Sequence, residues 1–299
     1  MIHDTTSDQR LLRGAAATLS VTVRDQDGGA TDSVGTVTCR VQKADGTDVL
    51  AAGSSTTNPT GTGTYARSLT AAQTATLETL LVTWTDGGDS STTLTTAEVV
   101  GGYYFSVAEA RAADSSLFRP EKADDTRMLD LRRQVEDEFE RICNVAFVPR
   151  YRRVRVDGTG TACLVVPDTM IRTVRSVREY VTATAYDTYT AAEIAAIPTS
   201  RTGELVRTDG DVWAYGYQNI VIEYEHGFDR PPEPIRQAAL RRVGQMLGEA
   251  KSAIPANTIS FTPDNGVTYR MSTPNYTRTG DVMIDAVLAR HSYAIPGMA

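Results

Sequence analysis

The sequence predicts an α+β protein in three parts: an all-β sandwich at 1–102, an α+β domain of two long helices and β-hairpins at 103–254, and an extended C-terminal arm with a short helix at 255–299. Apolar and polar residues alternate through much of the first hundred residues. Two later stretches instead repeat apolar residues at steps of three and four. The last segment is rich in Pro, Thr and Asn, which is typical of an extended chain.

The first part has the period-two pattern of half-buried strands. Apolar side chains alternate with Ser, Thr and Arg at 19–23 and at 37–41, and turn-forming pairs that contain Gly, Asn or Pro separate the strands. The capping pattern from Thr70 to Gln73 predicts one short helix before the strand that contains Trp84. We interpret this part as an immunoglobulin-like sandwich in which Trp84 packs without the disulfide of antibody domains.

Two long helices are expected in the middle part. Asp124 caps the first, whose apolar face carries Met128, Leu131, Val135, Phe139 and Ile142. Its opposite face holds Arg132 and Glu136 and is expected to lie in solvent. The second helix begins after Pro231, because proline is accepted in the first turn of a helix. The stretch between the two helices, 147–225, is expected to form β-hairpins.

Three shorter helices are predicted from their caps. Ser106 and Thr190 each stand three residues before a Glu, which is the spacing of a capping box. Asp281 is expected to cap a last short helix that carries Ile284, Val287 and Leu288 on one face.

Composition and motif spacing give no indication of catalysis. The formal net charge of −7 argues against a protein that coats duplex DNA. The sequence has no long apolar run, and its first residues lack the pattern of a secretion signal, so we expect no membrane span and synthesis in the cytoplasm. The cysteines form no CxxC pair and the histidines lie far apart, so we expect no metal, no cofactor and no enzyme. His226, directly after a strand, is interpreted as a turn or interface residue rather than a catalytic base.

Arginines are concentrated in two neighbouring stretches, and they form a charged patch together with Arg132 and Glu136. The residues of this arginine patch are Arg150, Arg152, Arg153, Arg155, Arg172, Arg175 and Arg178. The simpler interpretation, which we favour, is a solvated sheet face paired with the acidic helix. The functional interpretation is a subunit interface, or contact with phosphate or an acidic neighbour. An acidic protein is then favoured over DNA, because the whole chain is negative.

Four segments in fixed order carry a resemblance to a known family. They are 106–111, 142–150, 165–177, and 220–228 with its continuation through Pro231 and Pro232 to 240. Together they resemble the head-to-tail adaptor (head completion, connector) proteins of long-tailed bacteriophages. The resemblance covers 104–299, and the sandwich at 1–102 departs from the minimal family pattern.

The resemblance implies a structural virion protein of the neck, between head and tail, made in the host bacterial cytoplasm. Such a protein forms a ring, usually twelvefold, beneath the portal protein and presents a platform to a stopper or tail completion protein. Genome DNA passes through the bore without sequence-specific binding. The C-terminal segment is implied to reach into the portal through Ile259, Phe261, Tyr269, Met271, Tyr276, Ile284, Val287 and Leu288.

Three alternatives remain open. In the first, the arm folds back on its own domain as a hairpin; under the arm interpretation, truncation at Pro255 leaves a folded domain that no longer associates with the portal. In the second, the protein is an immunoglobulin-like adhesin or tail decoration that binds a cell surface, and exposed aromatic clusters in the sandwich loops would favour this. The third alternative is an unrecognised hydrolase.

Overall fold

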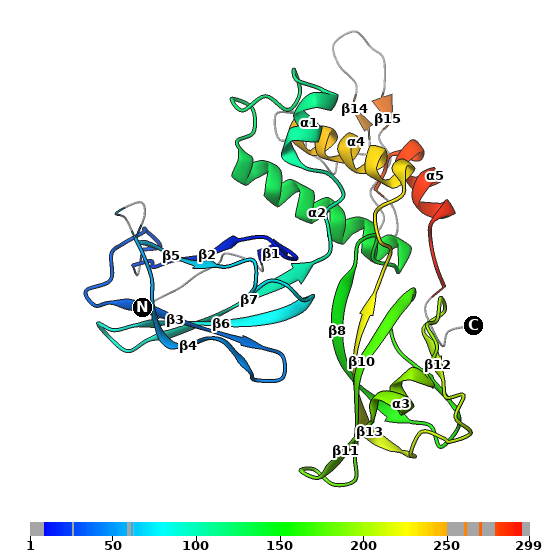
Figure 1. Ribbon diagram of the computed structural model, residues 1–299. Coiled ribbons are helices and arrows are strands. Elements are labelled where there is room, and N and C mark those ends of the chain that lie inside the picture. Colours follow the sequence, from blue (N-terminus) through cyan, green and yellow to red (C-terminus); the bar gives the residue numbers. More distant parts are fainter. Residues whose placement is uncertain are drawn as a thin grey trace.

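The computed structural model describes residues 9–25, 27–58, 61, 63–249, 260–261, 269–270 and 279–294. The chain is a mixed α+β protein (Figure 1). Its buried apolar residues fall into three clusters, which lie in the N-terminal sandwich, in a helical bundle and in a second β-rich part. None of the helices in these ranges is both long and apolar enough to cross a membrane.

The N-terminal part is a two-layer β structure, as the alternation predicts. One sheet has the order β1-β7-β6-β3-β4, with β1 parallel to β7, and the second pairs β2 with β5. The strands are β1 (Gln9–Leu12), β2 (Ala17–Thr22), β3 (Val37–Lys43), β4 (Asp48–Ser55), β5 (Thr64–Leu69), β6 (Glu78–Asp86) and β7 (Thr92–Val100). Inward residues of both sheets form one core, because successive side chains of a strand point to opposite faces.

Two details of this sandwich were predicted with different success. Trp84 is buried in the core and its Nε1 donates a hydrogen bond to Thr95 Oγ1 at 3.0 Å, while the facing Cys39 is a free thiol. The prediction of a short helix after Thr70 is wrong. The backbone N–H of Thr70 donates to the Gln73 side chain at 2.8 Å, as in a capping box, but the segment closes as a turn before β6.

Four helices form the bundle at the top of Figure 1: α1 (Val107–Ala113), α2 (Asp125–Cys143), α4 (Glu233–Glu249) and α5 (Val282–Arg290). Ser106 and Asp124 cap α1 and α2 as predicted. Asn144, in the left-handed conformation at φ 54°, ends α2. The apolar stripe of α2 packs against α4 and α5, where Met128, Val135 and Phe139 are fully buried.

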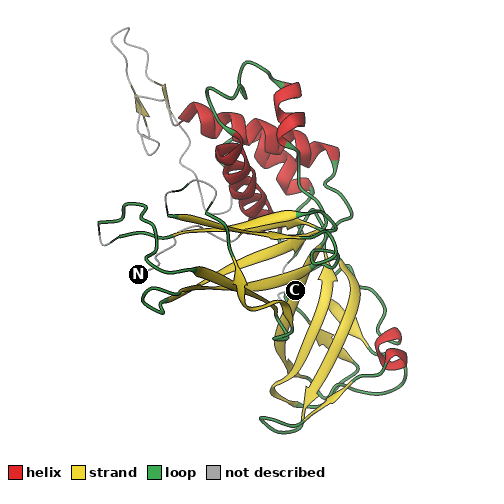
Figure 2. Ribbon diagram, turned by 60° about the vertical axis from the view of Figure 1, so that its left-hand side comes forward, coloured by secondary structure: helices red, strands yellow, loops and turns green. Residues whose placement is uncertain are grey.

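The second β-rich part is built on a four-stranded sheet of order β11-β10-β13-β8 (Figure 2). Its strands are β8 (Arg150–Gly158), β10 (Ile171–Tyr180), β11 (Tyr186–Thr188) and β13 (Gly216–His226). The pair β9 (Cys163–Val165) and β12 (Glu204–Val206) and the short helix α3 (Ala191–Ala195), capped by Thr190, complete it. Its core contains Trp213, stacked on Tyr189 at 5.8 Å.

The sandwich joins the rest of the chain without a linker. Gly101 N donates to Pro149 O at 2.9 Å, and a Cβ at Gly101 would lie 2.5 Å from Pro149 Cγ, so only glycine permits this approach. The sandwich is therefore held against the residue before β8 by Gly101, which directly follows β7.

The C-terminal segment differs from the predicted arm. Within the described residues, Ser260–Phe261 (β14) pairs antiparallel with Tyr269–Arg270 (β15). Helix α5 packs into the core of the bundle. The boundary expected between the middle part and the arm, at 254/255, therefore assigns α5 to a different part from the bundle core that contains Ile284 and Leu288.

Candidate functional site

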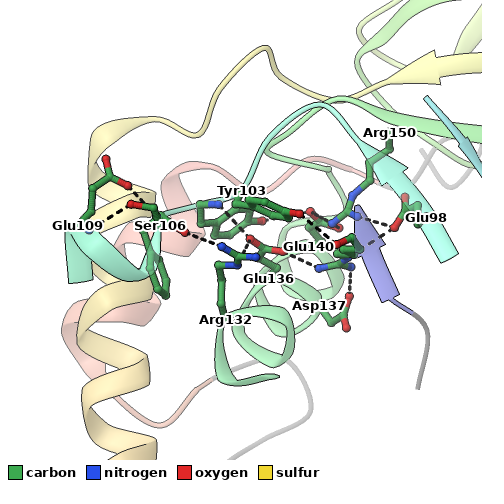
Figure 3. Close-up of polar contacts among 12 residues, drawn as sticks. Glu98, Tyr103, Ser106, Glu109, Arg132, Glu136, Asp137, Glu140 and Arg150 are labelled. Carbon is green, nitrogen blue, oxygen red and sulfur yellow. Dashed lines mark hydrogen bonds and ion pairs between the residues drawn. The ribbon is translucent and has the colours of Figure 1, made fainter. Parts of the chain in front are cut away.

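Charged side chains from the sandwich and from the bundle meet where β1 and β7 lie against α2 and β8 (Figure 3). Arg10 of β1 donates from Nη1 to Glu136 Oε2 at 2.7 Å and from Nη2 to Asp137. Arg150 of β8 donates to Glu98 of β7 at 2.6 Å and to Glu140 of α2 at 2.8 Å. We call this group the charge cluster; it comprises Arg10, Glu98, Arg132, Glu136, Asp137, Glu140 and Arg150.

The centre of the charge cluster is buried. The side chain of Glu136 is 1% exposed and that of Arg150 is 4% exposed. The backbone N–H of Tyr104 donates to Glu136 Oε1 at 3.0 Å, and Arg132 Nε lies 3.9 Å from the same oxygen. The carboxylate of Glu136 thus receives two full hydrogen bonds, one from Arg10 and one from the backbone, which compensate its loss of hydration.

Burial and ion pairing act in opposite directions on these groups. Burial raises the pKa of Glu140, which the neighbouring Arg150 lowers in part. For Arg150 burial disfavours the charge, yet Glu140 and Glu98 raise its pKa overall. Burial lowers the pKa of Arg132, although Glu136 opposes this. Mutual neutralisation is what keeps these side chains charged inside the protein.

The interpretation of Arg132 and Glu136 as a solvated helix face is wrong. Both side chains are buried, because Arg10 of the sandwich and the segment 103–105 cover the side of α2 that lies next to its apolar stripe. Arg132 donates to Phe105 O at 3.1 Å and lies over the Tyr103 ring, 3.6 Å from its centroid. Helix α2 therefore makes apolar contacts along one stripe and charged contacts along the neighbouring one, while Asp130, Gln134 and Asp137 are exposed.

Three members of the arginine patch contact the chain's own N-terminal sandwich: Arg150, through the pair with Glu98 described above, Arg153 and Arg175. Arg175 donates to Leu77 O at 2.6 Å and pairs with Glu225, and Arg153 donates to Ala44 O. Arg153 and Arg175 lie on one face of the β8-β13-β10 sheet, whereas Arg150, at the start of β8, lies on the other face. The expected acidic neighbour is in part another domain of the same chain.

The remaining patch arginines lie within the β-rich part. Arg152 pairs with Asp168 at 2.9 Å, and Arg172 pairs with Asp229 at 2.5 Å. The guanidinium groups of Arg155 and Arg178 lie over the rings of Tyr180 and Tyr186 at 4.6 and 5.4 Å. The structure thus brings the seven arginines together on one sheet, where the contacts described above engage each of them inside the chain.

A cavity of about 430 Å³ lies beside the charge cluster and is lined by Arg150, Asp168 and His226, among others. His226 Nδ1 is 3.9 Å from Asp168 Oδ1, and Tyr224 donates its hydroxyl to Asp168 Oδ2 at 2.5 Å. Burial lowers the pKa of His226 to about 4, against the attraction of Asp168.

Neutral His226 has no activated nucleophile beside it in the lining of this cavity. The hydroxyl of Thr169, which also lines it, donates to Asn144 O at 3.0 Å instead of to the imidazole. Within the described ranges, no three His, Cys, Asp or Glu side chains are placed to hold a metal ion. In the lining of this cavity, the Asp168 carboxylate accepts hydrogen bonds from both Arg152 and the Tyr224 hydroxyl.

The residues expected to reach the portal are divided by the structure. Ile284 and Leu288 are each 1% exposed inside the bundle, and Val287 packs beside them, so their assignment to a partner-binding arm is wrong. For this helix the folded-back alternative is the one observed. Phe261 and Tyr269 stand opposite each other in the β14–β15 pair, and Ile259, Met271 and Tyr276 lie outside the described residues.

Four members of the charge cluster were not among the site residues predicted from the sequence: Arg10, Glu98, Asp137 and Glu140. One signal was present, since Arg132, Glu136 and Glu140 recur at steps of four and therefore share one face of α2. A face with acidic and basic residues in register is also what an exposed helix shows, so spacing alone does not reveal that a sheet covers it.

Comparison with known proteins gives structural neighbours only. No family model matches the sequence, and no curated protein matches it at a significant score. A chain from the neck of an empty GTA (gene transfer agent) particle, computed with C6 symmetry, has a TM-score of 0.44 and 14% identity and covers 65% of this chain and 92% of that chain. A chain from the neck of a native GTA particle, computed with C12 symmetry, has a TM-score of 0.41 and 14% identity over 64% and 90% of the two chains.

A third neighbour, domains 5–6 of the S-layer protein SbsC, has a TM-score of 0.23 and 11% identity and covers 76% of this chain and 97% of that chain. At these TM-scores the likeness does not establish a common fold. Two of the three neighbours come from the neck of a phage-like particle.

Proposed function

We propose that this chain is a structural protein of the virion neck that forms a ring between the portal and the tail-side stopper, with genome DNA passing through the bore and with no catalytic activity of its own. The sequence resemblance over 104–299 carries the proposal. The structure supports it because three of the four resembling segments, 142–150, 165–177 and 220–228, meet where the bundle joins the β-rich part.

Contacts between the second and fourth segments show this convergence. Phe147 and Phe228 stack with centroids 5.8 Å apart and planes at 22°, and Phe228 N donates to Ala146 O at 3.0 Å. Gly227, at φ 94°, has no room for a side chain, since a Cβ would lie 2.4 Å from Val148 O. The residues that carry the resemblance are therefore the ones that set the angle between the two parts.

A ring built from identical copies needs two complementary faces on each copy. A bore through which DNA slides is also best served by weak phosphate contacts, with which the net charge of −7 agrees. The engagement of the arginine patch inside the chain fits the same requirement. The patch is thus proposed as an internal docking surface rather than a DNA-binding one.

We also propose that the N-terminal part is an immunoglobulin-like domain. Its strand order supports this: β2 and β5 correspond to strands B and E, and β7-β6-β3-β4 corresponds to G-F-C-C′. An adhesin role is disfavoured for it, because the aromatic residues of its described part, Tyr65 and Trp84, are buried.

The proposal is tested on the full chain, alone and mixed with the portal protein of the same phage. We expect native mass spectrometry and negative-stain microscopy to show a closed ring, twelvefold as in related adaptors, that caps the portal. A chain that stays monomeric in both conditions, or that binds glycans without the portal, contradicts it.

Portal contact is proposed for the part of the arm that is not α5. Phe261→Asp and Tyr269→Asp are expected to reduce portal association at least about tenfold, because a charge opposes an apolar contact. Leu94→Asp, at an exposed position of β7, is the control and leaves association unchanged. Full binding by both arm variants would refute this assignment.

A further inference from the structure

We infer that the N-terminal sandwich and the rest of the chain form one cooperative unit, in which Arg10 is the residue that couples them. The sandwich is then an integral part of the body rather than an appended module. This inference is independent of the proposed ring.

Glu136 is the key residue on the body side. Its carboxylate lies on α2, is nearly inaccessible to solvent, and is neutralised at 2.7 Å by Arg10, which belongs to the sandwich. On its own helix, Arg132 Nε lies 3.9 Å from the other carboxylate oxygen, and Arg132 directs another nitrogen to Phe105 O. The closest cation to this buried carboxylate therefore comes from the other domain.

The removal of Arg10 while the sandwich stays docked would leave Glu136 buried with the Tyr104 N–H as its main donor. A buried ion pair that loses one partner is strongly destabilising, because the remaining charge is desolvated without compensation. The carboxylate regains its hydration only if the sandwich moves away from α2. The pair with Arg10 therefore makes the ionised carboxylate of Glu136 favourable only while the sandwich is docked on α2.

Other contacts act in the same direction at separate points of the interface. Arg150 of the body pairs with Glu98 of the sandwich at 2.6 Å, and Tyr103 donates its hydroxyl to Arg10 O at 3.0 Å. Arg175 of β10 donates a hydrogen bond to Leu77 O, directly before β6, at 2.6 Å. Ion pairs and backbone contacts spread along an interface oppose independent opening of either side.

Hydrogen exchange of the full-length protein, followed by mass spectrometry, tests the coupling. In the wild type we expect the slowest amides of β7 and of α2 to share one protection factor. Arg10→Met is expected to lower the protection of both segments, and of the Tyr104 amide, by about a hundredfold. Arg13→Met, at an exposed position three residues along the chain, is the matched control and keeps wild-type protection.

Three results would overturn the inference. The first is a wild type in which β7 and α2 differ in maximal protection by more than about tenfold. The second is an Arg10→Met variant with wild-type exchange. The third is an Arg13→Met variant that loses as much protection as Arg10→Met, since the loss would then not come from the pair with Glu136.

Discussion

His226 shows how burial determines the charge of a single residue in this protein. The imidazole is enclosed between Tyr224, Asp168 and two arginines of β8, Arg150 and Arg152. Burial outweighs the attraction of Asp168 and lowers its pKa to about 4, below the value of about 6.5 expected in an unfolded chain. The folded protein therefore keeps His226 neutral at pH values at which the unfolded chain protonates it.

A pH dependence of stability follows from this residue. As the pH falls from about 6.5 to about 4, the unfolded chain gains a proton that the folded protein does not, so His226 lowers the free energy of unfolding by up to about 3 kcal/mol. Urea unfolding at several pH values measures the slope. We expect His226→Gln to flatten it in this window, and an unchanged slope would assign the effect to other groups.

At the scale of single elements, α2 and α5 show what a hydrophobic pattern predicts well. The steps of three and four correctly indicated the apolar stripe of α2, because that periodicity follows from the geometry of the helix. The same pattern predicted α5 and its cap. It did not indicate which partner each face meets, since a stripe of Ile, Val and Leu fits a neighbouring protein as well as the chain's own core.

Helix α5 is expected to stabilise the bundle rather than to act as a free arm. Ile284→Ala should lower the free energy of unfolding by about 2 to 5 kcal/mol, because it leaves a cavity in a closed core. Val282→Ala, on the same helix but 80% exposed, should change it by less than about 0.5 kcal/mol. Chemical denaturation of both variants measures the difference, and equal effects would place Ile284 outside the core.

One expectation about this element changes with the structure. Truncation at Pro255 removes α5 together with Ile284 and Leu288, and should therefore destabilise the bundle instead of leaving a folded domain. Loss of portal association after such a truncation would not identify the binding segment. Single substitutions such as Phe261→Asp serve that purpose.

At the scale of the whole molecule, the sequence indicated the α+β class and the N-terminal sandwich correctly, because strand alternation and helix caps are local signals. It did not indicate that 103–254 holds two cores. Nor did it indicate that the sandwich is docked on α2 through Arg10 and Glu136, which are 126 positions apart. No local pattern links residues at that separation, and their oppositely charged side chains are equally common on exposed surfaces.

The integration of the sandwich predicts that the effect of a substitution at Glu136 depends on Arg10. Glu136→Gln in the otherwise wild-type chain breaks the pair with Arg10 and should lower the free energy of unfolding by about 1 to 3 kcal/mol. In an Arg10→Met background the pair is already absent, so the same substitution should lower it by less than about 0.5 kcal/mol. The fluorescence of buried Trp213 in urea reports both, and equal effects would refute the coupling.

The contact between Gly101 and Pro149 has a consequence for any symmetric assembly of this chain. Because the two parts meet with no intervening tether, a copy has little freedom to swing its first hundred residues relative to its own axis. In a closed ring, symmetry would then repeat the same orientation of the sandwich in every subunit. Averaged images of such a ring would show the sandwich as sharply as the rest of each subunit.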